Sequence, residues 1–460
     1  MKWILPLLLI QFFFPLLSHA QWQDAYESFV KKESLNSAYI GVSFVDLETG
    51  ELIFEANGSK YFYPASVQKL LVTAAALQLL GGDYQYATNV YYTGTIQDNS
   101  LKGSLIIEAS GDPSLNSTYV SYDFLKLLLL ELEKAGIKKI EGSIIFNKQK
   151  NQHNTPATWL FEDIGNYYGV GAQIFNYKDN LYSINFRQKQ NGQVPSIEKI
   201  DVAIPYKFSL QLECSDALKG DHAFIMGAPF SLEREIRGTI GSGTGIQVVK
   251  GANAHPDFSL EEDIKKSIDV LITSSDKANR KLLFSGQSSV LKSLVRLCNY
   301  ESINLFAEAF LNTLGLEFKQ RYETESGIEI LKNFVNQLNL KSKELIIKDG
   351  SGLSRLNALS PNFASEWLYH FYKNEDFRSS LPVAGESGTL KYLNNPNIKG
   401  KILAKSGSAE GVVNYAGYLY ADNSKKYAFS IFVNNAFASK SAIRREIGIY
   451  LEQLIKLKEE

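Results

Sequence analysis

The chain is poor in cysteine and almost free of net charge. Its 460 residues include two cysteines, Cys214 and Cys298, and its 48 basic and 49 acidic side chains give a formal net charge of −1. Two cysteines are too few for a disulfide-stapled scaffold, so we expect buried thiols, with a bridge between them as the alternative. Without a basic excess, the chain lacks the positive field that attracts nucleic acid or anionic lipid, and we expect neither as a partner.

Several motifs of metal and nucleotide chemistry are also missing. The sequence has no His-Glu-x-x-His, no cysteine–histidine cluster with zinc spacing, no Walker A loop and no Gly-x-Ser-x-Gly nucleophile elbow. Its histidines after the first twenty residues are scattered, at His153, His222, His255 and His370. We therefore expect no metal site, no organic cofactor and no catalytic triad built on histidine.

Long hydrophobic runs are absent except at the very start. Lys2 precedes an apolar stretch from Ile4 to Leu17, and the small residues of Ser18-His19-Ala20 follow. This order is typical of a secretory signal peptide, and an uncleaved membrane anchor is the alternative. We expect cleavage near Ala20, a mature chain without a transmembrane segment, and a periplasmic or secreted location.

The two ends of the mature chain share one pattern and the middle has another. At the start, a hairpin pattern at 40–54 precedes a helical pattern at 66–80; near the end, strand patterns between 401 and 433 precede a helical pattern at 441–457. The middle is mostly short strands, such as those expected at 88–96, 181–186 and 208–212, and a helical pattern follows at 260–272. Strands and helices segregated in this way predict an α+β domain that is interrupted by an insert.

One serine and one lysine lie where nucleophilic chemistry is plausible. Ser-x-x-Lys occurs five times, but Ser66-Val67-Gln68-Lys69 is the occurrence that opens a strong helical pattern. A helix start offers Ser66 free N–H groups and positive potential, and Lys69 lies one turn further on, within reach of the hydroxyl. The alternative is that Ser66 merely caps the helix.

Two further motifs follow in the order used by serine enzymes that react with penicillin. Ser302-Ile303-Asn304 opens another helical pattern, and Lys405-Ser406-Gly407 follows the strand predicted at 401–404. A strand beside the nucleophile can align an extended peptide through its backbone hydrogen bonds. Taken singly, the first motif can be a helix cap and the second a polar strand end.

Together with these motifs, several longer segments resemble the DacB-type D-alanyl-D-alanine carboxypeptidases/endopeptidases, the penicillin-binding protein 4 or class C low-molecular-mass group. The resemblance covers nearly the whole mature chain. Ser406 and Ile303 depart mildly from it, standing where Thr and Asp are common. The segments are Tyr63-Pro64-Ala65-Ser66, Ser110–Leu115, Trp159, Glu162–Gly169, Asn299–Glu308, Asp349–Arg355, Leu381–Gly385 and Gly388–Leu390.

The resemblance implies a transpeptidase/β-lactamase-like domain, an antiparallel sheet flanked by helices, with a long and largely β insert forming two small extra domains. We expect residues 21–86 and 270–460 to form the catalytic domain, with the insert at 87–269. Within the insert we expect one subdomain at about 87–165 plus 240–269 and a second at about 166–239.

The expected reaction is attack by Ser66 on the carbonyl between two D-alanine units, or between D-alanine and a cross-linked side chain. Lys69 is the candidate base, and its amine is a useful base only if burial and a second cation lower its pKa. Lys405 is the expected second cation. Ser302 can relay the proton between the two lysines and the leaving amine.

The resemblance also implies substrate-binding groups. The backbone N–H groups of Ser66 and Ser408 form the oxyanion hole, and Asn304 holds a substrate amide. Ser406 and Gly407, with Lys405, receive the terminal carboxylate of the substrate.

The expected partners are peptidoglycan stem peptides as substrates and β-lactams as covalent inhibitors. Two other functions stay open: a β-lactamase or esterase of the same fold, and a non-catalytic module that binds cell wall or senses β-lactams. Turnover of penicillin and assay on a D-alanyl-D-alanine peptide separate them.

One cluster in the insert is a candidate for reading the substrate side chain. Trp159, Glu162, Asp163 and Tyr167 place aromatic rings beside carboxylates, a combination that suits the ammonium of a diaminopimelate side chain. The spacing favours Glu162 over Asp163. The alternative is that both acids are ordinary surface residues near a turn.

Overall fold

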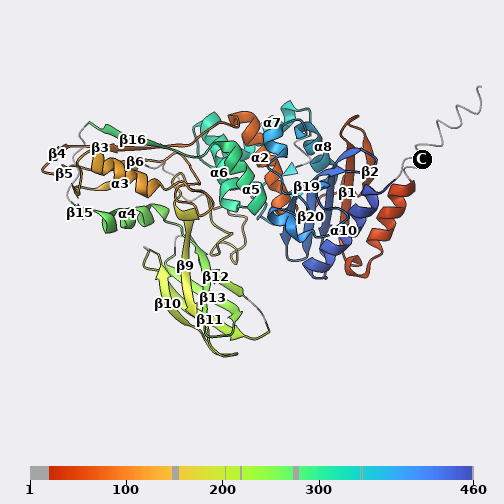
Figure 1. Cartoon of the computed structure of the whole chain (residues 1–460), viewed down its shortest axis with the longest axis horizontal. Coiled ribbons are helices and arrows are strands. Elements are labelled where there is room, and N and C mark those ends of the chain that lie inside the picture. Colours follow the sequence, from red (N-terminus) through yellow and green to blue (C-terminus); the bar gives the residue numbers. More distant parts are fainter. Residues whose placement is uncertain are drawn as a thin grey trace, which may run out of the picture. The chain divides into compact units, whose positions relative to one another are not determined.

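The computed structural model describes residues 20–457 except 148–154, 203, 218–219, 230, 273–278, 342 and 344. The predicted signal peptide, apart from Ala20, lies outside the described residues. The chain divides into two compact units (Figure 1). Unit 1 comprises the residues up to Gly82, Val295–Ser302 and the residues from Leu331 onward, and unit 2 comprises Asp83–Leu294 and Ile303–Ile330.

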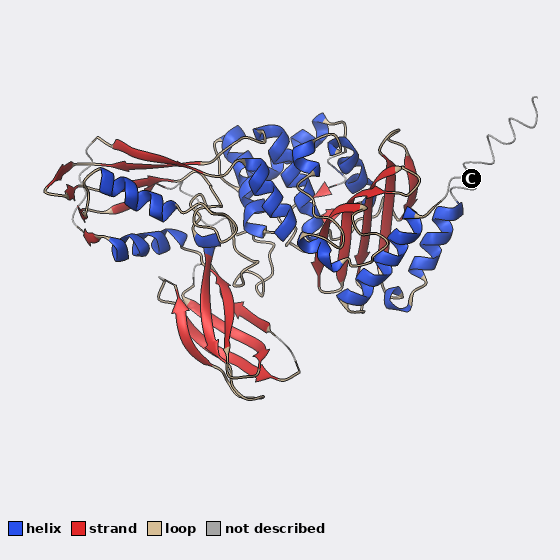
Figure 2. Ribbon diagram, in the orientation of Figure 1, coloured by secondary structure: helices blue, strands red, loops and turns tan. Residues whose placement is uncertain are grey.

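Unit 1 is built on an antiparallel sheet with the strand order β19-β20-β21-β1-β2 (Figure 2). β1 comes from the start of the chain and pairs along its length with β21 from the end. This pairing joins the two ends of the chain in one sheet, and the predicted α+β class is confirmed. The strands are β1 (Tyr39–Asp46), β2 (Leu52–Ala56), β19 (Ile402–Ala409), β20 (Val412–Tyr420) and β21 (Lys426–Asn434).

Helices cover both faces of this sheet. The remaining elements wholly within unit 1 are the helix at 20–30, η1 (Glu33–Leu35), η2 (Ala65–Gln68), α2 (Lys69–Leu80), β17 (Leu345–Ile346), β18 (Ala358–Leu359), α8 (Pro361–Phe371), α9 (Glu375–Arg378), η5 (Gly388–Tyr392) and α10 (Lys440–Ile455). Two helices belong partly to each unit: α5 (Leu291–Glu301) and α7 (Thr324–Gln337).

The alternation of side chains along β1 explains how the sheet is covered. Val42 and Phe44 point to one face, where they join the hydrophobic cluster that includes Ile447 of α10. Ser43 points to the other face, and its Oγ lies 2.7 Å from Oγ of Ser365 in α8. Since successive side chains of a strand face opposite sides, α10 and α8 pack on opposite faces.

Unit 2 contains two separate hydrophobic clusters. The first lies among two small sheets, with the orders β16-β3-β6-β8 and β15-β7-β5-β4, and two helices. Phe124, Leu128 and Leu132 of α3 are buried there at helical spacing. The elements are β3 (Ala87–Tyr92), β4 (Thr95–Gln97), β5 (Ser100–Lys102), β6 (Leu105–Glu108), α3 (Phe124–Lys134), β7 (Lys139–Glu141), β8 (Ile144–Asn147), α4 (Pro256–Ser267), β15 (Asp269–Leu271) and β16 (Lys281–Gln287).

The second cluster of unit 2 lies among two three-stranded sheets, with the orders β10-β9-β14 and β11-β13-β12. Its members include Ile184, Leu212 and Ile236, all fully buried. The boundaries predicted for two subdomains stay a prediction. The remaining elements of unit 2 are η3 (Lys178–Asn180), β9 (Leu181–Arg187), β10 (Ser196–Asp201), β11 (Lys207–Ser215), β12 (Asp221–Met226), β13 (Glu233–Gly241), β14 (Ile246–Ala252) and α6 (Asn304–Lys319).

Two elements read from the sequence differ in the structure. The helical pattern at 260–272 is wrong beyond Ser267, because Ile268 adopts an extended conformation and Asp269–Leu271 pairs in parallel with β7. The strand pattern at 88–96 breaks at Gly94. There φ is +77°, and a Cβ would lie 1.9 Å from the carbonyl oxygen of Lys102.

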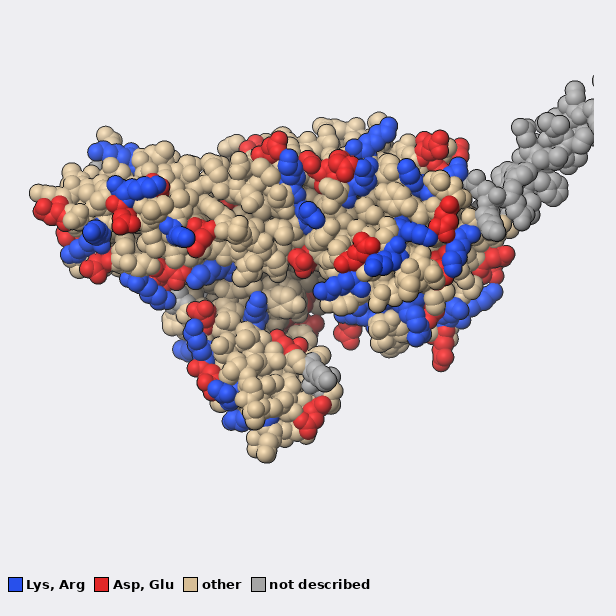
Figure 3. Space-filling view, viewed as in Figure 1, with Lys and Arg blue, Asp and Glu red and all other residues tan. Residues whose placement is uncertain are grey.

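The cysteines, the charged side chains and the apolar helices can now be compared with the expectations from the composition. Cys214 and Cys298 are both buried free thiols, so the expectation of unbridged cysteines is confirmed. On the face drawn in Figure 3, basic and acidic side chains are interspersed. None of the helices within the described ranges is both long and apolar enough to span a membrane.

Candidate active site

The nucleophile candidate lies in a short turn just before a buried helix. Ser66 belongs to η2, and α2 begins three residues later at Lys69. Its side chain does not cap either helix, so the alternative reading of Ser66 as an N-cap fails. The residue before it, Ala65, has φ +47°, a conformation that non-glycine residues rarely adopt. Ser66 is partly exposed, whereas the helix that follows is almost wholly buried.

Lys69 is close enough to the serine to exchange a proton with it. Its Nζ lies 2.8 Å from Oγ of Ser66, and the side chain is completely buried. The residues are three apart, and this spacing places both side chains on one face of the turn. A hydroxyl and an amine in this geometry form a nucleophile–base pair.

A second serine–lysine pair belongs to the same unit. Ser302 sits between α5 and α6 with φ +61°, and Nζ of Lys405 lies 2.9 Å from its Oγ. Lys405 also donates to the carbonyl oxygen of Ser406 at 2.8 Å. The two pairs bring together, within unit 1, all four residues predicted to be catalytic.

The electrostatics of this site disfavour two charged lysines. Lys405 is fully buried, and burial, followed by repulsion from the Lys69 cation, lowers the pKa of Lys405 well below its usual value. Because the repulsion is mutual, the pair gives up its first proton more readily than isolated lysines do. The site therefore favours a neutral amine, the form of lysine that can act as a base.

β19 runs beside the nucleophile and lies at the edge of the sheet. Gly407 of this strand approaches the turn so closely that a Cβ would lie 3.1 Å from N of Ser66 and 2.6 Å from O of Pro64. Within the described part of the chain, residues 406–408 pair with β20 alone. Their outer edge is thus open for an extended peptide.

Ser406 and Ser408 lie two residues apart on this edge strand, so their side chains point to the same face. Oγ of Ser406 lies 2.8 Å from Oγ1 of Thr389, and Ser408 is exposed. These two adjacent hydroxyls can hold a carboxylate by hydrogen bonds. Thr389 lies in a segment that resembles the family, but the sequence alone gave it no role.

Asn304 follows Ser302 by two residues and belongs to unit 2, as the first residue of α6. Its Nδ2 donates to the carbonyl oxygen of Tyr168 at 2.7 Å. This bond orients the side-chain amide, because the nitrogen is identified by the acceptor that it faces.

The acids predicted to read the substrate side chain lie in the same segment as Tyr168. Glu162 is exposed, whereas Asp163 is 8% exposed and accepts a hydrogen bond from the Tyr168 hydroxyl. Trp159 is buried and Tyr167 is exposed. Burial, followed by the charge of Asp163, raises the pKa of Tyr168, so its hydroxyl stays protonated.

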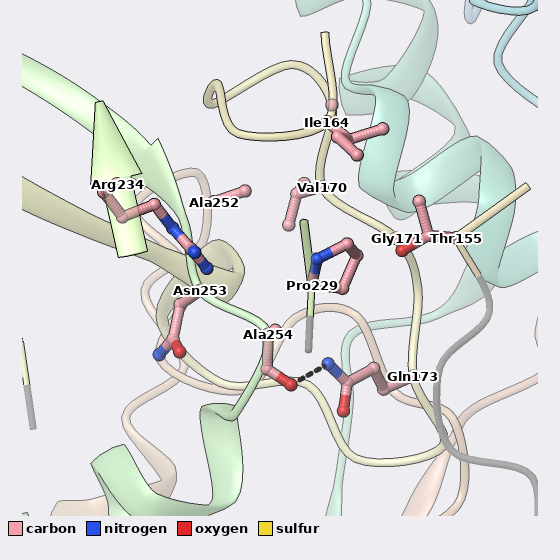
Figure 4. Close-up of a pocket in the computed structure, with 11 residues that line it drawn as sticks. Thr155, Ile164, Val170, Gly171, Gln173, Pro229, Arg234, Ala252, Asn253 and Ala254 are labelled. Carbon is pink, nitrogen blue, oxygen red and sulfur yellow. Dashed lines mark hydrogen bonds between the residues drawn. The ribbon is translucent and has the colours of Figure 1, made fainter. Parts of the chain in front are cut away.

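Polar side chains hold this segment in place. Asn166 is 3% exposed, donates to the carbonyl oxygen of Glu162 and accepts from N of Ile225 in β12 at 2.8 Å. Figure 4 shows a second tie, in which Gln173 donates to O of Ala254 at 2.7 Å, at the side of a pocket. The segment is therefore fixed at both ends against other parts of unit 2.

Sequence reasoning missed one supporting segment. Nζ of Lys69 donates to the carbonyl oxygen of Ser351 at 2.8 Å, and the buried carboxylate of Asp349 organises the backbone there. The segment Asp349–Arg355 is among those that resemble the family, so a signal existed but pointed to no role. A backbone carbonyl has no sequence signature of its own.

The donor groups of a metal site are not gathered anywhere in the described residues. No group of three or more His, Cys, Asp or Glu side chains there is placed to hold a metal ion.

Comparison with known proteins gives a consistent result. Residues 23–454 match the D-Ala-D-Ala carboxypeptidase 3 (S13) family. The chain is 25% identical over 413 residues to D-alanyl-D-alanine carboxypeptidase DacB of Haemophilus influenzae, which covers 86% of this chain and 85% of that protein.

Two solved structures are similar over nearly their whole length. The crystal structure of penicillin binding protein 4 (dacB) from Haemophilus influenzae has a TM-score of 0.79 at 24% identity, covering 94% of this chain and 99% of that one. The same protein complexed with a β-lactam has a TM-score of 0.74 at 23% identity, covering 95% and 99%. At these identities the likeness shows a shared fold.

Proposed function

Since the chain belongs to the D-Ala-D-Ala carboxypeptidase 3 (S13) family of serine peptidases, we propose that it hydrolyses D-alanyl bonds of peptidoglycan stem peptides through an acyl-enzyme on Ser66. One observation carries the proposal: each of two serines, Ser66 and Ser302, lies within 2.9 Å of the amine of a fully buried lysine. The substrates include the terminal D-alanyl-D-alanine bond and the D-alanyl-diaminopimelate cross-link.

Acylation begins when Oγ of Ser66 attacks the carbonyl carbon of the penultimate D-alanine. The hydroxyl proton passes to the neutral amine of Lys69, 2.8 Å away, as the new C–O bond forms. The C–N bond to the leaving group then breaks. Its nitrogen takes the proton that Lys69 received, relayed through Ser302, whose Oγ lies 2.9 Å from Nζ of Lys405, and Lys69 is neutral again.

The oxyanion of the tetrahedral intermediate is held by the backbone N–H groups of Ser66 and Ser408. The close approach of Gly407 to the Ser66 turn supports this role, because it brings the β19 backbone against the nucleophile. One such donor contributes about 3–4 kcal/mol to the stabilisation of the transition state. Asn304 binds a substrate amide through its side-chain amide, which the hydrogen bond to the Tyr168 carbonyl orients.

Deacylation repeats the same chemistry with water in place of serine. A water molecule attacks the ester carbonyl, Lys69 takes its proton, and Ser66 leaves with a proton returned from the amine. The terminal carboxylate of the peptide is bound by the hydroxyls of Ser406 and Thr389 and by the backbone at Gly407, next to Lys405. No step requires a metal or an organic cofactor.

β-Lactams are expected to acylate the same serine. Their strained amide mimics a D-alanyl-D-alanine end, and the ring-opened product cannot diffuse away as a leaving amine does. A complex of the similar Haemophilus influenzae protein with a β-lactam supports this proposal. We place the mature enzyme in the periplasm or outside the cell, where the cell wall lies.

The insert segment around Tyr168 is proposed to read the third residue of the stem peptide. A carboxylate beside an aromatic ring suits the ammonium of a diaminopimelate side chain. Sequence spacing favours Glu162 for this task, whereas the burial of Asp163 against Tyr168 favours Asp163.

A matched pair of peptides tests this reading. Both end in D-alanine, and one has a free diaminopimelate amine while the other has that amine acetylated. Wild type should prefer the free amine, and Glu162→Gln or Asp163→Asn should erase the preference while penicillin acylation is unchanged. If both variants keep the wild-type preference for the free amine, the ammonium is bound by another part of the protein.

The function itself is tested with purified cross-linked peptidoglycan and with a D-alanyl-D-alanine peptide. Mass spectrometry of the products should show loss of terminal D-alanine and cleavage of cross-links, and Ser66→Ala should abolish both. Rapid turnover of penicillin, with no release of D-alanine, would instead identify a β-lactamase. Binding without any product would identify a sensor.

A further inference from the structure

The segment that follows β17 is wrapped around one buried carboxylate. Asp349 is fully buried, and its carboxylate accepts from N of Gly352 at 2.8 Å and from N of Ser354 at 2.6 Å. It also accepts from Nδ2 of Asn357 at 2.8 Å. A buried carboxylate must be satisfied by donors, and here two of those donors are backbone N–H groups of its own segment. Asp349 therefore determines the path of residues 349–354.

This segment is tied to the residue next to the base. Nε2 of Gln68, which is 2% exposed, donates to the backbone oxygen of Asp349 at 2.5 Å and to its Oδ1 at 3.1 Å. At Gly352, where φ is +83°, a Cβ would lie 1.9 Å from the carbonyl oxygen of Ala65. The residues on either side of Ser66 thus contact the 349–354 segment, Ala65 through Gly352 and Gln68 through Asp349.

What the segment presents to the site is a backbone carbonyl. Nζ of Lys69 donates to O of Ser351 at 2.8 Å and lies 2.8 Å from Oγ of Ser66. A neutral amine has two N–H bonds and one lone pair. When one N–H is directed at Ser351, the lone pair is turned away from that carbonyl and can face the Ser66 hydroxyl.

A neutral carbonyl is a better hydrogen-bond acceptor for the Lys69 amine than a carboxylate would be. An anion in contact with Lys69 would stabilise the ammonium form and remove the base. The segment instead keeps its negative charge on Asp349, saturated with hydrogen bonds, and offers Lys69 an uncharged acceptor.

We propose that Asp349 is a positioning residue for the general base. Its carboxylate folds residues 349–354 so that the Ser351 carbonyl holds one N–H of Lys69 and leaves the lone pair for Ser66. The proposal rests on the proposed function, in which Lys69 deprotonates Ser66, and adds the residue that orients it.

Asp349→Asn is the direct test. The substitution keeps the shape of the side chain but turns an NH₂ toward donors, so the segment must repack and the Ser351 carbonyl shifts. We expect the acylation rate constant for a penicillin to fall about 10- to 100-fold, with the dissociation constant of the non-covalent complex within about twofold of wild type.

The pH dependence of the acylation rate distinguishes a change in the orientation of Lys69 from a change in its protonation. Asp349→Asn shifts the Ser351 carbonyl that accepts from Lys69 and removes the negative charge of Asp349. Both changes favour the neutral form of Lys69, so the rise of the acylation rate with pH should move to lower pH. The plateau at high pH, where Lys69 is neutral in both proteins, should stay depressed. A residue with a purely structural role would leave the plateau at the wild-type level.

Asp46→Asn is the matched control. Asp46 is also a buried carboxylate of unit 1 that closes a turn, accepting from N of Glu48 at 2.7 Å and N of Thr49 at 3.0 Å. Its replacement should lower the melting temperature and leave the acylation plateau unchanged. If Asp349→Asn behaves in the same way, Asp349 has no positioning role.

If Asp349→Asn does not fold, Gln68→Met decides the question. This variant removes the tie between the segment and the turn while keeping an unbranched side chain, and we expect the plateau to fall about 5- to 30-fold. A wild-type plateau in Gln68→Met would overturn the inference. Failure of the proposed function has a different signature: near-normal acylation of Lys69→Arg, whatever Asp349 does.

Discussion

Gly407 is the position where a single methyl group tests the geometry of the site most severely. An added Cβ would lie 2.6 Å from O of Pro64, 3.0 Å from N of Val67 and 3.1 Å from N of Ser66. All three are backbone atoms, so no side chain can rotate to make room. In Gly407→Ala, either β19 or the Ser66 turn must therefore move by several tenths of an ångström.

The expected loss of acylation rate follows from the hydrogen-bond donors that this movement displaces. Ser66 and Ser408 provide the proposed oxyanion donors, and both adjoin the contact. Loss of one preorganised donor costs about 3–4 kcal/mol, or about 10²–10³ in rate. We expect the acylation rate constant of Gly407→Ala to fall by about that factor, while the folded state remains populated.

Stopped-flow acylation by a chromogenic cephalosporin measures this change. Gly448→Ala is the matched control, because the same methyl group in α10 meets its nearest atom at an ordinary 3.6 Å. The control should acylate normally and gain up to about 1 kcal/mol of stability from the better helix former. An acylation rate within threefold of wild type in a folded Gly407→Ala protein would refute the argument that β19 and the nucleophile turn form one rigid oxyanion site.

Three further outcomes are expected. Lys69→Arg keeps a cation that cannot act as a base, so acylation should fall about 10²–10⁴-fold with the circular dichroism spectrum unchanged; a near-normal rate would assign the base elsewhere. Because the pKa of Lys405 is lowered in the folded protein, the unfolded chain binds this proton more tightly than the folded protein does. Below the unfolded pKa of about 10.4, proton binding therefore favours the unfolded state and lowers the free energy of unfolding. Lys405→Met should therefore raise the stability at pH 7 by about 1–4 kcal/mol, and melting curves should show the gain shrinking as the pH rises toward 10; a constant gain would contradict this sign. Cys214 and Cys298 should both resist a thiol reagent in the native protein and both react in denaturant without a reductant, whereas no free thiol in denaturant would indicate a bridge.

The groups of the proposed reaction could be predicted from the sequence because each lies in a short motif with its own local structure. Ser66 and Lys69 are one turn apart just before an apolar helical pattern, and Lys405 follows a strand pattern. The α+β class was predictable for a similar reason, since strand and helix patterns are clear at both ends of the chain.

The supporting contacts could not be predicted because they join distant parts of the chain through backbone atoms. The Ser351 carbonyl is 282 positions from Lys69, and the Tyr168 carbonyl is 136 positions from Asn304. Neither contact depends on the identity of the accepting side chain. Long-range pairing also ended the helix pattern at 260–272 early, where residues 269–271 join a sheet instead.

One helix was missed although its signals are local. α8 begins after Ser360, whose side chain accepts from N of Phe363, and Pro361 occupies the first turn. Phe363, Trp367 and Phe371 recur every four residues and are buried. A serine cap, a proline at the first turn and this spacing together predict a helix.

Ser66 is the residue that we propose to form the acyl-enzyme, and peptide mapping after reaction with penicillin is the direct test. The mature protein is incubated with labelled penicillin, digested and sequenced by mass spectrometry. We expect one adduct of penicilloyl mass on the peptide that contains Ser66, and no labelling of Ser66→Ala. An adduct on another serine, or undiminished labelling of Ser66→Ala, would contradict it.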